Sequence, residues 1–298
     1  MASAEVDARS GWDGRSERSW WLAAVDGDGA DAPRLEGPTS ADVCIVGGGF
    51  TGLWTALNLK QRDPGLDVAI VEAETCGSGA SGRNGGCALT YWHHFTNLQA
   101  ICGTAEALRL ARASADAVAE IGQFCEEHDI DAGYRADGWL WTATNAAQVG
   151  RWRRTLDAIS SAGEGPFVEV QADELAARTG SRAHLAGVYE ASAASVQPAA
   201  LARGLRRVAL DHGVRIFEWS PMVTLERSTP LVVQCAGGSV RAGQVILAMN
   251  AWAARIPELR NSFVIVSSDL AITAPVGPRL SDLGWTDGVC VSDSRLMV

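Results

Sequence analysis

Three glycines, Gly47, Gly49 and Gly52, have the spacing of a pyrophosphate-binding turn. They lie in the segment ADVCIVGGGFTG, residues 41–52, between a short apolar run and a helix-forming run. The first glycine allows a tight turn, the second lets a pyrophosphate approach the backbone, and the third lets a helix pack closely on a strand. The phosphates would lie at the helix N-terminus, where free N–H groups and the helix dipole favour anions. The pattern therefore predicts a dinucleotide site.

An acidic residue follows the glycines at a useful distance. The apolar run 68–71 predicts a second strand, and Glu72 comes directly after it, 72 − 47 = 25 positions beyond Gly47. A carboxylate at this place can accept hydrogen bonds from a ribose diol. Strand, glycines, helix, strand and acid in this order favour a dinucleotide over a simple glycine-rich turn.

A second loop of small residues, CGSGASGRNGGC at 76–87, comes next. Such a loop could let backbone N–H groups approach a large planar cofactor, and a nicotinamide domain has no need for it at this place. Arg83 and Asn84 could bond to phosphate or to the edge of a flavin. A mobile Gly/Ser surface loop is the alternative. The position of the loop favours a flavin, with an NAD-dependent dehydrogenase as the less favoured reading.

The motifs GGGFTGLWTALNLK, VEAE and GASGRNGG together resemble the D-amino-acid-oxidase-like superfamily of FAD-dependent amine oxidoreductases. The loop GASGRNGG is similar to that of the γ-glutamylputrescine oxidase branch and of relatives described as aminophosphonate oxidoreductases. The segments SWWL, GWLWTATNAAQ, VQPAALARGLRRVA, VILAMNAWAARIPEL and SDSRLMV also look like that branch, so the resemblance covers the chain from about Ser19 to Val298.

The resemblance implies FAD as the cofactor and a set of residues that contact it. Phe50 and Thr51 would follow the glycines over the pyrophosphate, and Glu72 and Ala73 would lie at the adenosine ribose. The path to the flavin would be lined by Ala80, Ser81, Arg83, Asn84, Gly85, Gly86 and Cys87. Met222 stands where the family usually has a valine whose backbone meets adenine, and Ala248 and Asn250 would end a strand near the FAD.

The family runs on well past the point that corresponds to Val298. Its C-terminal part completes the substrate sheet and returns to the FAD domain with a glycine-rich segment over the flavin ring. The resemblance therefore implies a C-terminally incomplete site, either because the chain is a fragment or a truncated product, or because the missing part comes from elsewhere.

The composition is that of an ordinary globular protein, with 298 residues, 47% hydrophobic and 20% charged. The net charge of −10 argues against nucleic acid as the main partner. Seven cysteines without a C-x-x-C pair are typical of reduced thiols in a cytoplasmic protein. The first twenty residues carry no apolar core of a signal peptide, and no apolar run is long enough to cross a membrane. The oligomeric state stays open.

The expected fold is α/β with an α+β substrate part: a Rossmann-like FAD-binding domain interleaved with an antiparallel-sheet substrate domain, C-terminally incomplete. Periodicity and end signals predict helices at 53–60, 103–128, 146–162, 173–179 and 198–212, and strands at 43–46, 68–71, 138–144, 214–217, 222–225, 231–235, 245–249 and 263–274. The expected segments are an irregular lead-in at 1–40, the FAD-binding unit at 41–102, mostly helical and substrate-domain segments at 103–195, a return to the FAD domain at 196–260 and the start of a substrate sheet at 261–298.

Three further side chains have two readings each, and a fourth has one. His93 and His94 could lie near the flavin or the substrate entrance, or pack without a chemical role; as adjacent residues they make a poor metal pair, and no metal site is expected. Asn250 could contact the flavin or cap a helix beginning at Ala251. Trp252 is assigned to packing.

The predicted function is oxidation of the C–N bond of a small amine, amino acid or aminophosphonate by hydride transfer to flavin N5. The cofactor carries that chemistry, and the protein supplies orientation and electrostatics. The sequence identifies no catalytic residue. The alternatives are a truncated flavin-binding module without turnover and, less favoured, an NAD-dependent dehydrogenase.

Overall fold

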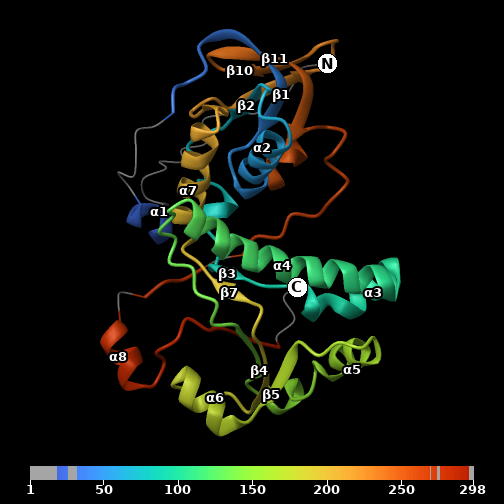
Figure 1. The fold of residues 1–298 in the computed structure, drawn as a ribbon, viewed down its shortest axis with the longest axis vertical. Coiled ribbons are helices and arrows are strands. Elements are labelled where there is room, and N and C mark those ends of the chain that lie inside the picture. The colour runs from blue at the N-terminus through green and yellow to red at the C-terminus, as the bar shows by residue number, and fades with distance from the viewer. Residues whose placement is uncertain (1–18, 26–31, 269, 274–275, 295–298) are drawn as a thin grey trace, which may run out of the picture.

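Two larger sheets lie at opposite ends of the computed structural model, with one long helix between them (Figure 1). The structure describes residues 19–25, 32–268, 270–273 and 276–294. The expected lead-in falls partly outside this range, since 1–18 and 26–31 are not described. Where it is described, it holds a short helix, α1 (Trp20–Ala24), and the start of the first strand, so it is more regular than expected.

The larger sheet has six strands. Their order is β8 (Arg215–Phe217), β2 (Val68–Val71), β1 (Gly37–Val46), β11 (Gly238–Leu247), β10 (Leu231–Cys235) and β9 (Met222–Glu226). The first four are parallel, and β9 to β11 form an antiparallel meander. Strand β1 begins six residues earlier than the predicted 43–46, because it pairs with β11 from Gly37 onward.

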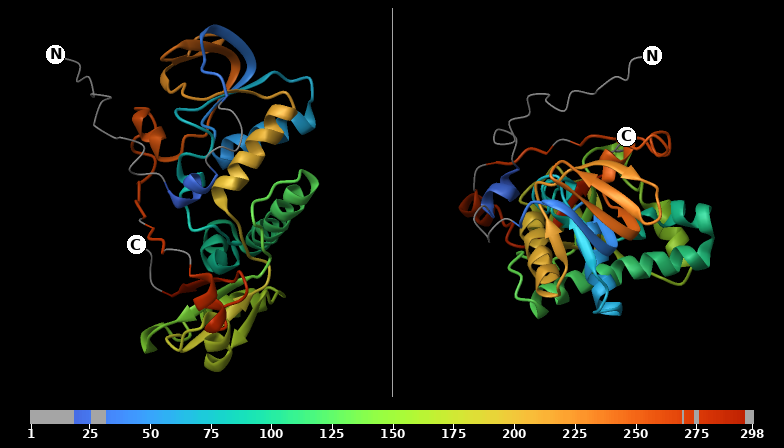
Figure 2. Two further views of the ribbon diagram at one scale, coloured as in Figure 1. Left: turned by 90° about the vertical axis from the view of Figure 1, so that its left-hand side faces the viewer. Right: turned by 90° about the horizontal axis from the view of Figure 1, so that it is seen from above.

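Helices α2 (Phe50–Arg62) and α7 (Pro198–Asp211) pack side by side on one face of this sheet (Figures 1 and 2). Side chains alternate across a strand, so Val43 and Ile45 meet these helices while Cys44 and Val46 join a second apolar cluster on the other face. The carboxyl ends of β1 and β2 thus meet the N-terminus of α2 at one edge of the sheet.

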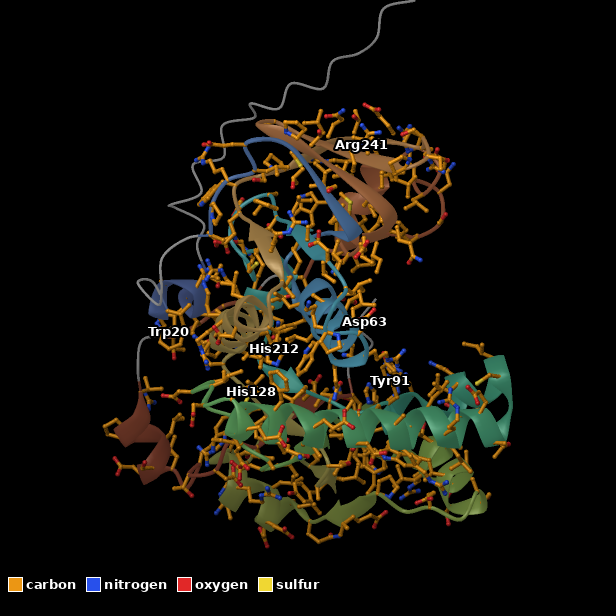
Figure 3. All side chains as sticks on the ribbon, turned by 45° about the horizontal axis from the view of Figure 1, so that its top comes forward. Trp20, Asp63, Tyr91, His128, His212 and Arg241 are labelled. Carbon is orange, nitrogen blue, oxygen red and sulfur yellow. The ribbon has the colours of Figure 1, made fainter. Side chains whose placement is uncertain are left out.

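The middle layer is formed by α3 (Phe95–Cys102) and α4 (Thr104–Glu127), preceded by the 3₁₀ turn η2 (Trp92–His94). The predicted helix at 103–128 is confirmed. Helix α3 was not predicted, and it is held by the fully buried Phe95, which packs on α4. At the other end of α4, the His128 ring lies 6.0 Å from that of His212, just after α7 (Figure 3).

The second sheet has four strands in the order β12 (Cys290–Asp293), β4 (Trp139–Ala143), β6 (Ala186–Glu190) and β5 (Phe167–Val170). It is antiparallel apart from β12, which runs parallel to β4. Helices α5 (Arg153–Ser161) and α6 (Ala172–Thr179) belong to this end of the molecule (Figure 1). The expected helix 146–162 is interrupted, because only η3 (Ala146–Gln148) and α5 are helical.

The remaining elements are short. They are η1 (Ala80–Gly82), η4 (Asn250–Arg255), α8 (Gly277–Asp282) and a two-stranded sheet of β3 (Cys87–Ala88) and β7 (Ala194–Ser195). Within the described ranges, no helix has both the length and the apolar character that a membrane span requires.

The predicted strand at 263–274 is wrong for the residues that the structure describes. Residues 263–268 and 270–273 are irregular, and 269 and 274 lie outside the described part. The side chains of Val264 and Val266 are 87% and 67% exposed. An apolar run becomes a strand only beside a pairing partner, and no described strand pairs with this segment.

Candidate functional site

The turn after β1 is built so tightly that two of its glycines admit no side chain. Gly47 has a φ of +112°, and a Cβ there would lie 2.5 Å from the carbonyl oxygen of Ala248. Its N–H donates to the Val71 carbonyl at 2.9 Å, which ties the turn to β2. At Gly52 a Cβ would come within 1.9 Å of the Gly47 carbonyl oxygen. These contacts confirm the mechanical roles predicted for both residues: a tight turn and close helix–strand packing.

Gly49 stands directly before α2 and gives the helix no capping side chain. The N–H of Phe50, the first helical residue, donates to Ser81 Oγ at 2.9 Å. A Cβ on Gly49 would lie 2.9 Å from that same oxygen. The N-terminus of α2 therefore faces the second glycine-rich loop, and Thr51 beside it is exposed. The positive end of the helix dipole is available there for an anion.

Glu72 reaches back from the end of β2 to the glycine turn. One of its oxygens accepts the Gly48 N–H at 2.6 Å, and the other accepts the Glu74 N–H at 3.0 Å. Burial raises the pKa of Glu72 above its usual range, while the two amides act in the opposite direction. The carboxylate thus lies against the turn that would carry the pyrophosphate, with the exposed Ala73 next to it.

The second loop is held in shape largely by its own polar residues. Asn84 donates to the carbonyls of Ala80 and Ser81 at 3.1 and 3.0 Å, and its side-chain oxygen accepts the Gly86 N–H at 2.9 Å. Arg83 Nε donates to the Ser78 carbonyl at 2.7 Å. The side chains that were expected to reach phosphate or flavin therefore brace the loop backbone in this structure.

The lead-in segment fastens the same loop from outside. Ser19 Oγ donates to the Gly82 carbonyl at 2.6 Å, and Trp21 Nε1 donates to the Asn84 carbonyl at 2.9 Å. Leu22 is buried against Ala199 of α7, whereas Trp20 on the same short helix stays half exposed. The motif SWWL thus anchors the second loop.

A buried ion pair that the sequence reading missed supports the start of this loop. Glu218 is fully buried, and its two oxygens accept hydrogen bonds from Arg206 at 2.9 and 3.0 Å. The same oxygens accept the N–H groups of Cys76 and Ala32 at 2.8 and 2.7 Å. The sequence did carry a signal for this ion pair: Glu218 is an acid directly after the predicted strand 214–217, and a buried carboxylate needs partners.

The far side of the turn is formed by the end of β11. The Ala248 N–H donates to the Val46 carbonyl at 2.8 Å, so Ala248 lies beside Gly47. Asn250 is exposed, has a φ of +46° and is itself the first residue of η4, whose N-cap, Met249, makes no side-chain hydrogen bond. The expectation that Asn250 caps a helix beginning at Ala251 is therefore wrong.

The Trp252 ring covers the start of the second loop. A Cβ on Gly79 would lie 3.6 Å from the ring, and the indole lines a cavity of about 330 Å³ together with Ala251, Ala254, Arg255 and Ile265. Met222 begins β9 and is half buried in the apolar cluster on the far face of the sheet from α2.

The structure thus gathers most of the predicted residues at one edge of the large sheet. Gly47, Gly49, Glu72, Ser81 and Ala248 are linked there through the contacts given above. Cys87 lies one loop away, on β3, where it pairs with β7. Among the described residues, no three or more His, Cys, Asp and Glu side chains come together in a group that could hold a metal ion.

His93, in η2, packs against the second sheet. Its ring centroid is 5.2 Å from that of Trp139 and 4.0 Å from that of His94, and its Nδ1 is buried without a hydrogen-bond partner among the described residues. Burial lowers the pKa of His93 to about 4, helped by His94. The ring is therefore neutral at pH 7 and packs against an aromatic surface.

The glycine turn fits a dinucleotide in its shape and in its donors. Side chains are excluded at Gly47 and Gly52, the N-cap residue Gly49 has no side chain of its own, and a carboxylate lies beside the turn. Small residues let a pyrophosphate approach the backbone, and the adjacent acid can accept from a ribose diol. Gly47, Gly49, Gly52 and Glu72 are thus the residues that would hold the phosphates and ribose.

Comparisons with known proteins agree with this geometry. Gamma-glutamylputrescine oxidoreductase from Escherichia coli (strain K12) is 28% identical over 283 residues, covering 94% of this chain and 66% of that protein. A probable oxidoreductase OrdL from Rhizobium meliloti (strain 1021) is 28% identical, covering 94% and 65%. The crystal structure of glycine oxidase from Geobacillus kaustophilus matches with a TM-score of 0.59 at 28% identity, covering 74% of this chain and 58% of that one.

The chain spans about two thirds of the length of the first two relatives. The family model for FAD dependent oxidoreductases, DAO, matches residues 42–297, which include the glycine turn, both sheets and the end of β12. The predicted resemblance and fold class are thereby confirmed, and the cofactor of this family is FAD. The chain belongs to the FAD dependent oxidoreductase (DAO) family.

Proposed function

We propose that this chain carries the FAD-binding part of an enzyme that oxidises the C–N bond of a small amine, amino acid or aminophosphonate. The observation that carries the proposal is the glycine turn at the N-terminus of α2, where Gly47 and Gly52 leave no room for side chains and Glu72 lies alongside. The names of two relatives, a gamma-glutamylputrescine oxidoreductase and a glycine oxidase, support a nitrogen-bearing substrate. Bound FAD would supply the redox chemistry by accepting a hydride at N5.

The residues have distinct tasks in this proposal. Gly47, Gly49 and Gly52, with Phe50 and Thr51, receive the pyrophosphate, while Glu72 and Ala73 receive the adenosine ribose. The flavin path is lined by Ala80, Ser81, Arg83, Asn84, Gly85, Gly86 and Cys87, with Ala248 and Asn250 opposite and the Met222 backbone at the adenine. The bonds of Asn84 and Ser19 to the second loop support a preformed path, because they hold its carbonyls in place without the cofactor.

The segments alternate between the two sheets in the same proposal. Residues 41–102 and 196–260 supply the FAD domain, while 103–195 and 261–298 supply substrate-domain segments. The joining of β1 and β2 with β8 to β11 in one sheet supports this interleaving. All seven cysteines are free thiols, which supports a reducing, cytoplasmic location.

The first test is the visible absorption spectrum of the purified chain after addition of FAD and removal of the excess. We expect a retained flavin band in the native chain and its loss in Gly49→Val, because the new side chain collides with Ser81 Oγ and blocks the approach to the backbone. Gly165→Val is the matched control, since a Cβ there meets nothing within 4 Å. Full retention of FAD by folded Gly49→Val would contradict the assignment.

The second test concerns the substrate. Anaerobic addition of amines, amino acids and aminophosphonates to the flavin-loaded chain should bleach the flavin band with one of these classes. A chain that holds FAD and is bleached by none of them would reduce the proposal to flavin binding without turnover.

A further inference from the structure

Two cysteines from distant parts of the chain meet beside the second loop. Cys87 begins β3 directly after that loop and is exposed, whereas Cys290 begins β12 and is only 6% exposed. Their neighbours bring them together. Leu89, two residues after Cys87 and so on the same side of the extended chain, packs on the apolar cluster that contains Cys290.

The backbone of β7 fixes the position of the buried thiol. Cys290 Sγ donates to the Ala194 carbonyl at 3.6 Å, and Ala194 is the direct cross-strand partner of Ala88, the residue after Cys87. The Cys290 N–H in turn donates to the Gly138 carbonyl at 3.0 Å. The sulfur of Cys290 is thus held against the two-stranded sheet whose first residue is Cys87.

The two thiols act on each other. A hydrogen bond with Cys290 lowers the pKa of the Cys87 thiol, against the effect of burial, and the same contact raises the pKa of Cys290. The exposed sulfur is therefore the better nucleophile and the buried one holds its proton, which is the asymmetry of an attacking and a resolving cysteine.

We propose that Cys87 and Cys290 form a thiol–disulfide exchange site that takes low-molecular-weight disulfides. The Cys87 thiolate attacks one sulfur of the disulfide RSSR, the S–S bond breaks, and RS⁻ leaves and takes a proton from water. Cys290 then attacks the Cys87 sulfur of the mixed disulfide, and the second RS⁻ leaves with the Cys290 proton. Two protein thiols lose two electrons in total, and RSSR becomes two RSH.

The resulting bond would join two parts of the fold that are far apart in sequence. Residue 87 ends the second glycine-rich loop, and residue 290 begins the edge strand of the four-stranded sheet. Oxidation would thus lock the exit of the loop to β12. Because Cys87 also lines the proposed flavin path, the exchange is assigned to the chain without bound FAD, where this thiol is exposed, and it needs only the two thiols and an external disulfide.

The test treats the folded chain with oxidised glutathione near pH 7.5 and counts free thiols after denaturation. We expect the count to fall from seven to five, 7 − 2 = 5, and to return on addition of dithiothreitol. Trypsin should release one linked pair of peptides, residues 84–109 joined to residues 280–295. Cys102 lies on the first of these peptides and is exposed, so a Cys102→Ser variant that still forms the link assigns it to Cys87.

Two variants separate the steps. Cys290→Ser should stop at a stable glutathione adduct on Cys87, and Cys87→Ser should leave Cys290 reduced, because that sulfur is buried. Cys102 is the control for Cys87, because it is also exposed and its thiol donates to the Leu98 carbonyl at 3.0 Å. A stable glutathione adduct on Cys87 of the native chain, a link to any other cysteine, or seven thiols left after treatment would overturn the proposal.

Discussion

The glycine-turn region and the segment 261–294 are both rich in recognisable motifs, yet they differ sharply in how their side chains are held. In the first, the predicted strands 43–46 and 68–71 are present and are buried on both faces of the large sheet. In the second, residues 263–268 and 270–273 are irregular and largely exposed, and of the residues that the structure describes in this segment only those of β12 join a sheet. An apolar pattern therefore becomes a strand only where the chain also supplies a pairing partner.

The two regions should differ most in the free energy of unfolding that is lost when one ion pair of each region is broken. Glu218→Ala should lower the free energy of unfolding by about 3–5 kcal/mol, because it removes the buried carboxylate to which Arg206 and two buried N–H groups donate. Asp287→Ala removes the 3.1 Å pair with Arg178, whose side chains are 32% and 23% exposed, and should cost below about 1 kcal/mol. Urea unfolding of both variants measures the two costs. Equal costs would mean that the two regions are held alike.

The glycine-turn region could be predicted in detail because its determinants are local. The positive φ of Gly47 and the close approach of Gly52 to the Gly47 carbonyl involve neighbouring residues, and β2 was predicted with its observed ends. The long helix 103–128 followed from its periodicity, with one residue of difference at each end. These features need little knowledge of the rest of the chain.

The predictions failed where contacts between residues far apart in the sequence determine the structure. Helix α3 depends on Phe95 packing against α4, and β1 extends back to Gly37 because β11 lies beside it. The support of the second loop by Ser19 and Glu218 joins residues far apart in sequence. No local pattern encodes such contacts, so these parts of the site could not be derived from spacing alone.

A pair of valines tests the comparison at the level of single side chains. Val68→Ala should cost about 2 kcal/mol, because this β2 residue is fully buried and its truncation leaves a cavity. Val264→Ala should stay within about 0.5 kcal/mol, because its side chain is already in contact with water. Thermal and urea unfolding give both values. A cost above about 1 kcal/mol for Val264→Ala would show that this segment is packed in solution after all.

The smallest effect on stability at neutral pH is expected from the titration of His93. This residue lies between the two regions in the sequence and packs against Trp139. Its pKa in the folded protein is about 4, below the ordinary 6.5, because burial disfavours the charged ring. At pH 7 the ring is largely neutral in both the folded and the unfolded chain, so its titration contributes little. Between pH 6.5 and about 4 the unfolded chain binds a proton that the folded chain does not, and stability falls as the pH is lowered.

His93→Phe keeps an aromatic ring against Trp139 and removes the titration. We expect the variant to lose less stability than the native chain between pH 6.5 and 4, with the difference vanishing toward pH 7. Urea unfolding at several pH values measures this, and the ring resonance missing from the variant identifies His93 in the NMR titration of the native chain. A midpoint near 6.5 for that resonance, or parallel pH profiles for the two proteins, would place the ring in water. The segment after Cys87 would then be exposed to solvent, as residues 263–268 are. The well-packed region would end nearer to the second glycine-rich loop.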